Sequence, residues 1–219
     1  MVDPDQGEPA VTSSRDVVLG RIRAAVGTAP DPGPVRRDYR QGSGALPGSP
    51  ELLDLFEDRL VDYKASVRRC AADEVTGAVA TILAGRFDRP ARVVVPADLP
   101  GPWAGPAAVV DDGLTPAHLD ALDGVVTACA VAIAETGTIV LDGGAGQGRR
   151  VITLVPDLHV CVVRADQIVG SVPECVRRLD PERPLTFISG PSATSDIELS
   201  RVEGVHGPRT LEVVLVVPR

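Results

Sequence analysis

Apolar residues at helical spacing alternate with turn-forming residues in the first part of the chain. Val18, Ile22 and Val26 share one helical face, and Ser13 or Ser14 can cap the start of that helix. The stretch 28–49 is rich in Gly, Pro and Arg, which predicts a long linker. We expect helices over residues 15–26 and 50–69, and another that Asp73 caps.

Further along, the pattern changes to short, nearly continuous apolar runs. The run over 125–134 is typical of a strand that is buried on both faces of a sheet. We expect further strands at 92–95, 107–110, 138–141, 151–155, 159–163, 185–188 and 211–217, and helices from Thr115-Pro116 and over 172–179. This alternation predicts an α/β fold, a three-layer sandwich with a largely parallel sheet.

The same pattern predicts how the chain is organised. Residues 1–11 are expected to form a disordered tail, and residues 12–49 an N-terminal helical arm with its linker. Residues 50–219 are expected to form a single α/β domain. The arm, together with an aromatic content of only 3%, leaves a homo-oligomer open as one arrangement.

Composition and charge exclude several classes of partner. Hydrophobic residues make up 44% of the chain, as in globular proteins, and the core must be aliphatic. A net charge of −8 opposes binding to the phosphate backbone of nucleic acids. The sequence has no apolar run of the ~18 residues that a membrane helix needs, and its N-terminus has no signal peptide pattern. We therefore expect a cytoplasmic protein with neither nucleic acid nor membrane as partner.

The four cysteines give no sign of a metal or a cofactor. Cys70, Cys129, Cys161 and Cys175 are far apart in the sequence and form no CxxC pair. Cys129 and Cys161 lie in apolar runs, which indicates buried, unreactive thiols. We expect no metal and no cofactor bound by this chain.

The first candidate site follows the long apolar run. Glu135, Thr136, Gly137 and Thr138 come where α/β sheets commonly place their ligands, and a half-buried Glu135 would suit acid–base or nucleophilic chemistry. The same residues also fit a glycine turn in which Glu135 only caps backbone amides. On the first interpretation Glu135 is catalytic, and the three residues after it bind the ligand.

The second candidate is the glycine-rich loop 142–150. Its glycines allow backbone N–H groups to approach an anion, and Arg149 and Arg150 add positive charge. Gly146, Gly148 and Arg149 are the predicted ligand-binding residues. The loop has neither GxGxxG nor a Walker lysine, so it does not indicate a nucleotide in particular, and a plain hairpin loop remains the alternative.

The third candidate is the block Ser189-Gly-Pro-Ser-Ala-Thr-Ser-Asp-Ile-Glu198 followed by Gly204-Val-His-Gly-Pro208. Small hydroxyl residues after a strand build sites more often than cores. We expect His206 to carry protons, although a structural role in the turn is the alternative. The ligand-binding residues predicted in this block are Gly190, Ser192, Thr194 and Asp196. His159 is expected to be a core residue with a hydrogen-bond partner.

Several of these motifs together resemble the lactate utilization protein C family, which carries the LUD domain. They are Ile133-Ala-Glu-Thr-Gly-Thr-Ile-Val-Leu141, Gly146-Gln-Gly-Arg149, Pro156-Asp-Leu-His-Val160 and the block over 189–208. The resemblance implies a fold like that of the glucosamine-phosphate isomerase, ribose-phosphate isomerase and CoA-transferase superfamily. It also implies a role in oxidising L-lactate to pyruvate beside partner proteins that carry iron–sulfur clusters.

Three hypotheses for function follow. In the first, the chain is an accessory subunit of a lactate-oxidising complex that binds substrate or docks partners. In the second, it is an enzyme of its own, CoA-transferase-like or acting on a sugar phosphate or carboxylate, with Glu135 as nucleophile or base. In the third, it is a small-ligand sensor or scaffold without chemistry. Each allows a small carboxylate or phosphate ligand.

Overall fold

The computed structural model describes residues 13–27, 33–194, 202–203 and 206–218. The chain divides into two compact units, residues 1–39 and 40–219. In the first unit, helix α1 (Ser14–Val26) lies where the periodicity predicts it. The Ser13 side chain caps α1 by accepting a 3.2 Å hydrogen bond from the Asp16 amide.

The second unit is built on a six-stranded sheet in which every neighbouring pair of strands is parallel. Its strands, in spatial order, are β1 (Ser66–Cys70), β12 (Thr210–Val216), β7 (Leu158–Arg164), β4 (Gly124–Thr127), β2 (Val93–Val95) and β3 (Val109–Val110). The central strands β12 and β7 are the longest, and their side chains are almost all buried. Strands of this composition suit the middle of a sheet that is covered on both faces.

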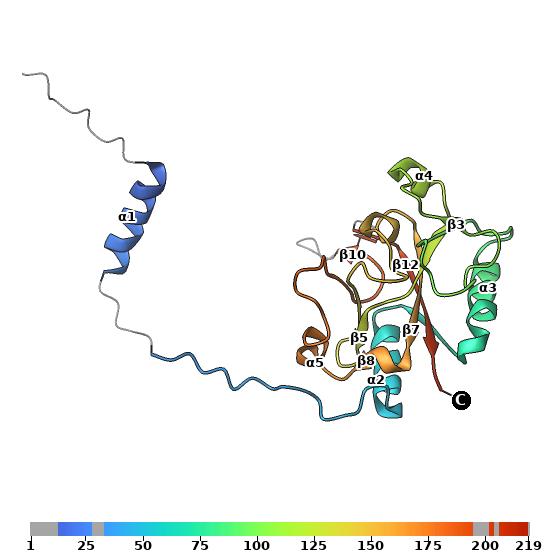
Figure 1. The fold of residues 1–219 in the computed structure, drawn as a ribbon, viewed down its shortest axis with the longest axis horizontal. Coiled ribbons are helices and arrows are strands. Elements are labelled where there is room, and N and C mark those ends of the chain that lie inside the picture. Colours follow the sequence, from blue (N-terminus) through green and yellow to red (C-terminus); the bar gives the residue numbers. More distant parts are fainter. Residues whose placement is uncertain (1–12, 28–32, 195–201, 204–205, 219) are drawn as a thin grey trace, which may run out of the picture. The chain divides into compact units, whose positions relative to one another are not determined.

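Strand β12 shows how the two faces are covered. Leu211, Val213 and Leu215 pack into the core beneath helix α2 (Pro50–Asp62). Val214 and Val216 pack on the other face beneath helix α3 (Val75–Arg86). Because side chains alternate along a strand, one strand serves both cores. Figure 1 shows α2 and α3 with β7 and β12 between them.

A smaller, mixed sheet lies on the α2 face. It contains, in spatial order, β8 (Ile168–Val169), β5 (Val131–Ile133), β6 (Thr138–Leu141) and β9 (Thr186–Ile188). Ala132 and Ile139 from this sheet share one core cluster with Leu211, Val213 and Leu215 of the large sheet. Helix α3, the six-stranded sheet, and the layer of α2 with the small sheet make three layers, so the predicted fold class is confirmed.

Short elements connect these layers. Helix α4 (Pro116–Asp120) begins at the predicted place, where the Thr115 hydroxyl caps it. The others are η1 (Ala72–Glu74), η2 (Arg150–Thr153), η3 (Ala165–Gln167), α5 (Val172–Val176), and the hairpin strands β10 (Ala193–Thr194) and β11 (Val202–Glu203). Within the described ranges, no helix has the length and apolar character to cross a bilayer.

The predicted helix over 50–69 is too long. Helix α2 ends at Asp62, and Lys64 takes a positive φ of 67° that turns the chain. Residues 66–70 then form β1, which pairs in parallel with β12. The partner strand lies far along the chain, so the local pattern carries no trace of this pairing. The Asp73 helix also starts later, since a short 3₁₀ turn precedes α3.

The run over 125–134 is two strands rather than one. Strand β4 belongs to the large sheet and β5 to the small one, and Ala128 to Ala130 carry the chain between them. Both strands are fully buried, so the apolar pattern shows no break. Glu135 therefore follows a strand of the small mixed sheet and not a strand of the parallel sheet.

Two further predictions were wrong in type or length. The predicted strand over 151–155 is largely the 3₁₀ turn η2, in which the Ile152 amide donates to the Arg149 carbonyl at 3.1 Å. A short run with one buried apolar residue, Ile152, fits a turn of helix as well as a strand. The predicted helix over 172–179 ends earlier, with α5 at Val176.

Candidate functional site

A cavity of about 240 Å³ lies where the first residues of β7 and β12 face strand β9, the turn η2 and residues 206–208. It therefore adjoins the amino ends of two parallel strands, whereas the usual site of an α/β sheet adjoins the carboxyl ends. The polar residues in its wall include Arg150, Thr153, His159, Thr186, Ser192 and His206. Two of the three histidines of the chain thus line one cavity.

Arg150 is held in this wall by its own turn of 3₁₀ helix. Its Nη1 donates to Thr153 Oγ1 at 3.1 Å, and Thr153 Oγ1 donates back to the Arg150 carbonyl at 3.1 Å. Surrounding protein atoms partly shield the guanidinium from water and lower the pKa of Arg150 from its ordinary value. It stays charged at neutral pH, and no carboxylate among the described residues pairs with it.

The segments 189–194 and 206–208 are joined at the cavity rim. The His206 amide donates to Ser192 Oγ at 3.0 Å, and the Ser192 amide donates to the Pro208 carbonyl at 2.8 Å. Gly190 has a φ of 82°, and a Cβ there would lie 2.7 Å from Tyr63 Cβ. Only glycine fits this turn, so Gly190 shapes the rim of the cavity that it lines.

His159 lies in the floor of the cavity. It is 1% exposed, and its Nε2 lies 2.8 Å from Thr127 Oγ1 on the neighbouring strand β4. The prediction that His159 is a core residue with a partner is confirmed. Because this bond uses Nε2, a ligand in the cavity could meet only Nδ1.

A second cavity of about 570 Å³ adjoins the first. Arg150, Thr153 and Thr186 line both cavities, while Leu141 and Pro184 are among the residues that line only the second. Arg150 therefore stands in the wall that the two cavities share. An anion bound there could extend in either direction.

The glycine-rich loop owes its glycines largely to close packing. Gly146 and Gly148 have φ values of 71° and 69°, and added Cβ atoms would lie 2.8 Å from Pro100 Cδ and 2.7 Å from Ile152 Cδ1 respectively. Gly148 lines the second cavity, whereas Gly146 is buried. The loop is closed by Asp142, which accepts hydrogen bonds from the Gly144 amide and the Gln147 side chain.

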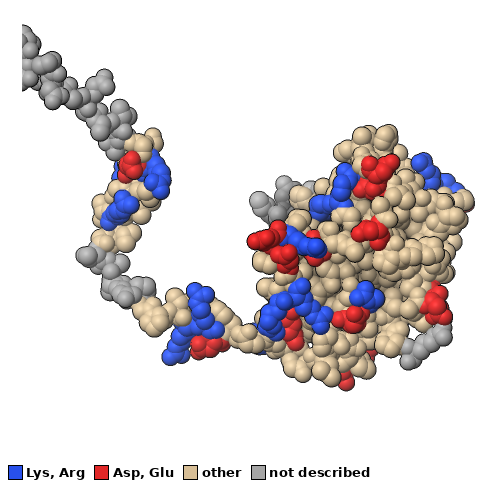
Figure 2. Space-filling view, viewed as in Figure 1, with Lys and Arg blue, Asp and Glu red and all other residues tan. Residues whose placement is uncertain are grey.

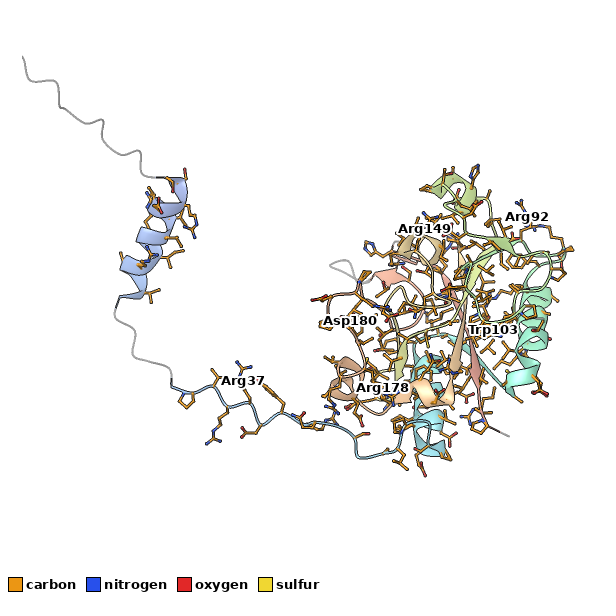
Figure 3. All side chains as sticks on the ribbon, in the orientation of Figure 1. Arg37, Arg92, Trp103, Arg149, Arg178 and Asp180 are labelled. Carbon is orange, nitrogen blue, oxygen red and sulfur yellow. The ribbon has the colours of Figure 1, made fainter. Side chains whose placement is uncertain are left out.

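Arg149, the predicted ligand-binding arginine, is paired within the protein. Its Nη2 and Nε donate to Asp111 Oδ1 and Oδ2 at 2.5 and 2.7 Å, and Nη2 also reaches the Leu114 carbonyl at 3.0 Å. Figure 3 shows Arg149 beside the segment that leads into α4. The Arg149 hydrogen bonds hold the pKa of Asp111 below its ordinary value. Arg149 lines the second cavity but already has a carboxylate.

The Glu135 turn connects strands β5 and β6 of the small sheet. Arg40 Nη2 donates to Glu135 Oε2 at 2.5 Å and to Oε1 at 2.8 Å. A Cβ on Gly137, whose φ is 57°, would lie 2.7 Å from Arg59 Cβ of α2. Glu135, Thr136 and Gly137 are not among the described residues that line either cavity.

Thr138 connects this turn with the cavity rim. Its hydroxyl lies 2.7 Å from Thr136 Oγ1 and 2.8 Å from Ser189 Oγ, and Ser189 lines the first cavity. The structure thus brings His206, Ser192 and Gly190 together and keeps Glu135 apart from them. Thr194 lies in β10, and Asp196 lies outside the described residues.

The predicted ligand-binding set contained Arg149 but omitted Arg150, Thr153 and Thr186. Arg149 and Arg150 are adjacent in the sequence. Nothing in the local sequence says which of the two meets Asp111, because that carboxylate is 38 positions away from Arg149.

Known proteins match most of this chain. The LUD domain family model matches residues 114–216. Lactate utilization protein C of Deinococcus radiodurans is 52% identical over 173 residues, which cover 76% of this chain and 80% of the relative. Lactate utilization protein C of an Exiguobacterium species is 26% identical over 228 residues, covering 95% and 98%.

A solved structure agrees with these matches. The crystal structure of a DUF162 family protein from Deinococcus radiodurans superposes with a TM-score of 0.65 at 44% identity. The superposition covers 76% of this chain and 96% of that protein.

Proposed function

This chain belongs to the LUD domain family of lactate utilization protein C, and on that premise we propose that it takes part in L-lactate utilization as an accessory subunit. The observation that carries the proposal is the 52% identity to the Deinococcus radiodurans relative over 173 residues. In the proposed role, the chain assists the oxidation of L-lactate to pyruvate and does not itself carry the electrons.

The placement of the cysteines supports a role in which this chain does not carry the electrons. Cys129 and Cys161 lie in the core beneath α2, Cys70 lies in the core beneath α3, and Cys175 lies in a third cluster. All four are buried and free. Thiolates in three separate cores cannot converge on one iron–sulfur cluster, so we propose that partner proteins supply the cluster ligands.

The contribution of this chain would come from its cavity and surface. The Arg150 cavity offers a charged guanidinium, and Ser192 and His206 stand at its rim. A small carboxylate is the ligand that fits both the family and this charge. By contrast, an enzyme that used Glu135 as nucleophile would first have to open the ion pair with Arg40.

Deletion and reconstitution test the proposal. A host strain without the gene for this chain should fail to grow on L-lactate as sole carbon source and should grow normally on pyruvate. A plasmid copy should restore growth. In extracts, the purified chain should restore L-lactate-dependent pyruvate formation to the deletion strain but should form none alone.

Two results would contradict this role. Normal growth of the deletion strain on L-lactate would show that the chain is dispensable for lactate use. Oxidation of L-lactate by the purified chain alone, with a flavin or cluster absorption spectrum, would show that it is the oxidising enzyme rather than an accessory.

A further inference from the structure

Arg150 differs from most arginines around it in having no carboxylate partner among the described residues. Across residues 40–218, many arginines form ion pairs with Asp or Glu, and Figure 2 shows blue and red groups side by side on the visible face. The paired residues are Arg40, Arg59, Arg69, Arg86, Arg89, Arg149, Arg164, Arg183 and Arg209. Arg150 lines a cavity and forms no such pair with any described residue.

The wall of the cavity is suited to an anion. Its described lining residues include Arg150, His159 and His206 and contain no Asp or Glu. The chain as a whole carries a net charge of −8, which repels anions at long range. A local cation without a competing carboxylate is therefore the feature that would draw an anion to this place.

The geometry of Arg150 favours a carboxylate. Thr153 holds Nη1, which leaves Nε and Nη2 without a partner among the described residues. A planar fork of two N–H donors matches the two oxygens of a carboxylate. One guanidinium also balances the single charge of a monocarboxylate, whereas a phosphate group carries about 1.5 to 2 charges at neutral pH.

The size of the cavity and the other residues that line it further restrict the class of ligand. The first cavity alone, at about 240 Å³, is smaller than the roughly 300–1,000 Å³ of pockets for drug-sized molecules, so a ligand confined to it is small. The Ser192 and Thr186 hydroxyls in its wall can each donate and accept hydrogen bonds. Such groups serve a hydroxyl or a carbonyl next to the carboxylate equally well.

We propose that this cavity is a binding site for a small 2-hydroxy- or 2-oxo-monocarboxylate, with Arg150 pairing with the carboxylate and Ser192 contacting the 2-substituent. The inference rests on the proposed function for the choice of L-lactate and pyruvate as probes. The position of the site rests on the structure alone. Thr153 is a positioning residue, since it acts by holding Arg150.

Isothermal titration of the full-length protein at constant ionic strength tests the site. L-lactate and pyruvate should each bind saturably at one site per chain. R150Q should weaken L-lactate binding about 10- to 100-fold, as expected for loss of a charge-assisted hydrogen bond. R150K keeps the charge but loses the fork, so its affinity should fall between those of R150Q and the wild type.

A matched control and a ligand series separate this site from general charge effects. Arg68 is exposed on the edge strand β1 and lines neither cavity, so R68Q should bind L-lactate within about 2-fold of the wild type. Propionate, which lacks the 2-substituent, should bind about 2- to 10-fold more weakly than L-lactate. S192A should abolish most of that preference.

Three outcomes would overturn the inference. They are no saturable binding of L-lactate or pyruvate to the wild type, equal losses in R150Q and R68Q, and tighter binding of inorganic phosphate than of either carboxylate. Circular dichroism and thermal melting check that each variant is folded. If R150Q does not fold, the L-lactate affinity of R150K relative to the wild type decides the test. If these binding experiments fail but the deletion strain does not grow on L-lactate, the proposed site is rejected and the proposed function is kept.

Discussion

The Glu135 turn and the Arg150 cavity both border the small sheet, and each contains an arginine. At the turn, Arg40 pairs with Glu135 through both carboxylate oxygens, and Gly137 packs against α2. At the cavity, Arg150 is held by the Thr153 hydroxyl, and no described carboxylate neutralises it. At the turn, Arg40 balances the charge of Glu135. At the cavity, no described residue balances the charge of Arg150.

This difference shows that a charged residue that stands out in the sequence can already be paired within the folded protein. A glutamate at the end of an apolar run attracts attention in a sequence, yet its charge is matched within the protein. A guanidinium without a carboxylate can lower its free energy by binding an external anion. The chemical type of Glu135 suggested a site, but the charges around it show that its carboxylate is already paired with Arg40.

The largest effect on stability is expected from packing at the turn. Gly137→Ala places a Cβ 2.7 Å from Arg59 Cβ at a φ of 57°. Backbone strain and overpacking together should cost about 2–4 kcal/mol in the free energy of unfolding, measured by urea denaturation. The folded variant should still bind L-lactate. Lost binding in a fully stable variant would place the turn in the ligand site.

Gly105→Ala is the matched control for Gly137→Ala. Gly105 has a φ of 72°, but a Cβ there would have no atom within 4 Å. Only the backbone term of about 1–2 kcal/mol should remain. The difference between the two variants then measures the packing of the turn against α2.

The floor of the cavity should give the next largest effect. Thr127→Val keeps the shape of the side chain but removes the hydroxyl 2.8 Å from His159 Nε2. A buried ring nitrogen without its partner should cost about 1–3 kcal/mol in the free energy of unfolding. Thr81→Val, on the exposed face of α3, should change stability by no more than about 0.5 kcal/mol. Equal urea-denaturation midpoints for Thr127→Val and Thr81→Val would refute a structural role for the Thr127–His159 hydrogen bond.

The contrast between Arg149 and Arg150 can be sharpened by changing the carboxylate that Arg149 meets. The Asp111 side chain is 4% exposed, and Asp111→Asn removes its charge. The melting temperature at pH 7 should fall by about 2–4 °C, which corresponds to about 1 kcal/mol in a protein of this size. Asp112→Asn, at an exposed neighbouring residue, is the control.

The effect of Asp111→Asn should depend on pH with a definite sign. The pKa of Asp111 in the folded state lies below its ordinary value of 3.8, mainly because of Arg149. The charged carboxylate therefore stabilises the fold above pH 3.8, and this stabilisation is lost as the pH falls through the folded-state pKa. The melting temperatures of variant and wild type should converge well below pH 3.8. A constant difference would rule out the charge as the cause.

The smallest effect is expected from Glu135→Gln. The side chains of Arg40 and Glu135 are 60% and 43% exposed, so solvent screens their attraction and the loss should not exceed about 1 kcal/mol. L-lactate affinity should stay within about 2-fold of the wild type. Glu57→Gln removes a carboxylate from another exposed ion pair and is the control. A loss of L-lactate affinity as large as that of R150Q would contradict the distinction drawn between the Glu135 turn and the Arg150 cavity.

Much of the fold could be predicted because its signals are local. The serine cap and apolar face of α1, the Thr115-Pro116 start of α4 and the apolar runs of β6, β7, β9 and β12 all lie within single short windows. The edge strand β1 escaped prediction because its partner β12 lies far along the chain. The division of residues 125–134 between two sheets escaped because both halves are equally buried.

The candidate site was predicted in part for the same reason. The small polar residues after β9 and the turn at His206 are locally distinctive, and Gly190, Ser192 and His206 all line the first cavity. Arg150 could not be singled out from Arg149. The interaction that separates them involves Asp111, in a segment that precedes α4.

The sequence by itself determined the α/β class, the order of most helices and strands, and the family, because periodicity, turn residues and motifs are properties of short stretches. Only the tertiary structure decided which charges are neutralised and which border a cavity. Ion pairs depend on distances of a few ångströms between residues that can stand far apart in the chain. For this protein, Glu135 is neutralised by Arg40, whereas Arg150 lines a cavity without a carboxylate partner among the described residues.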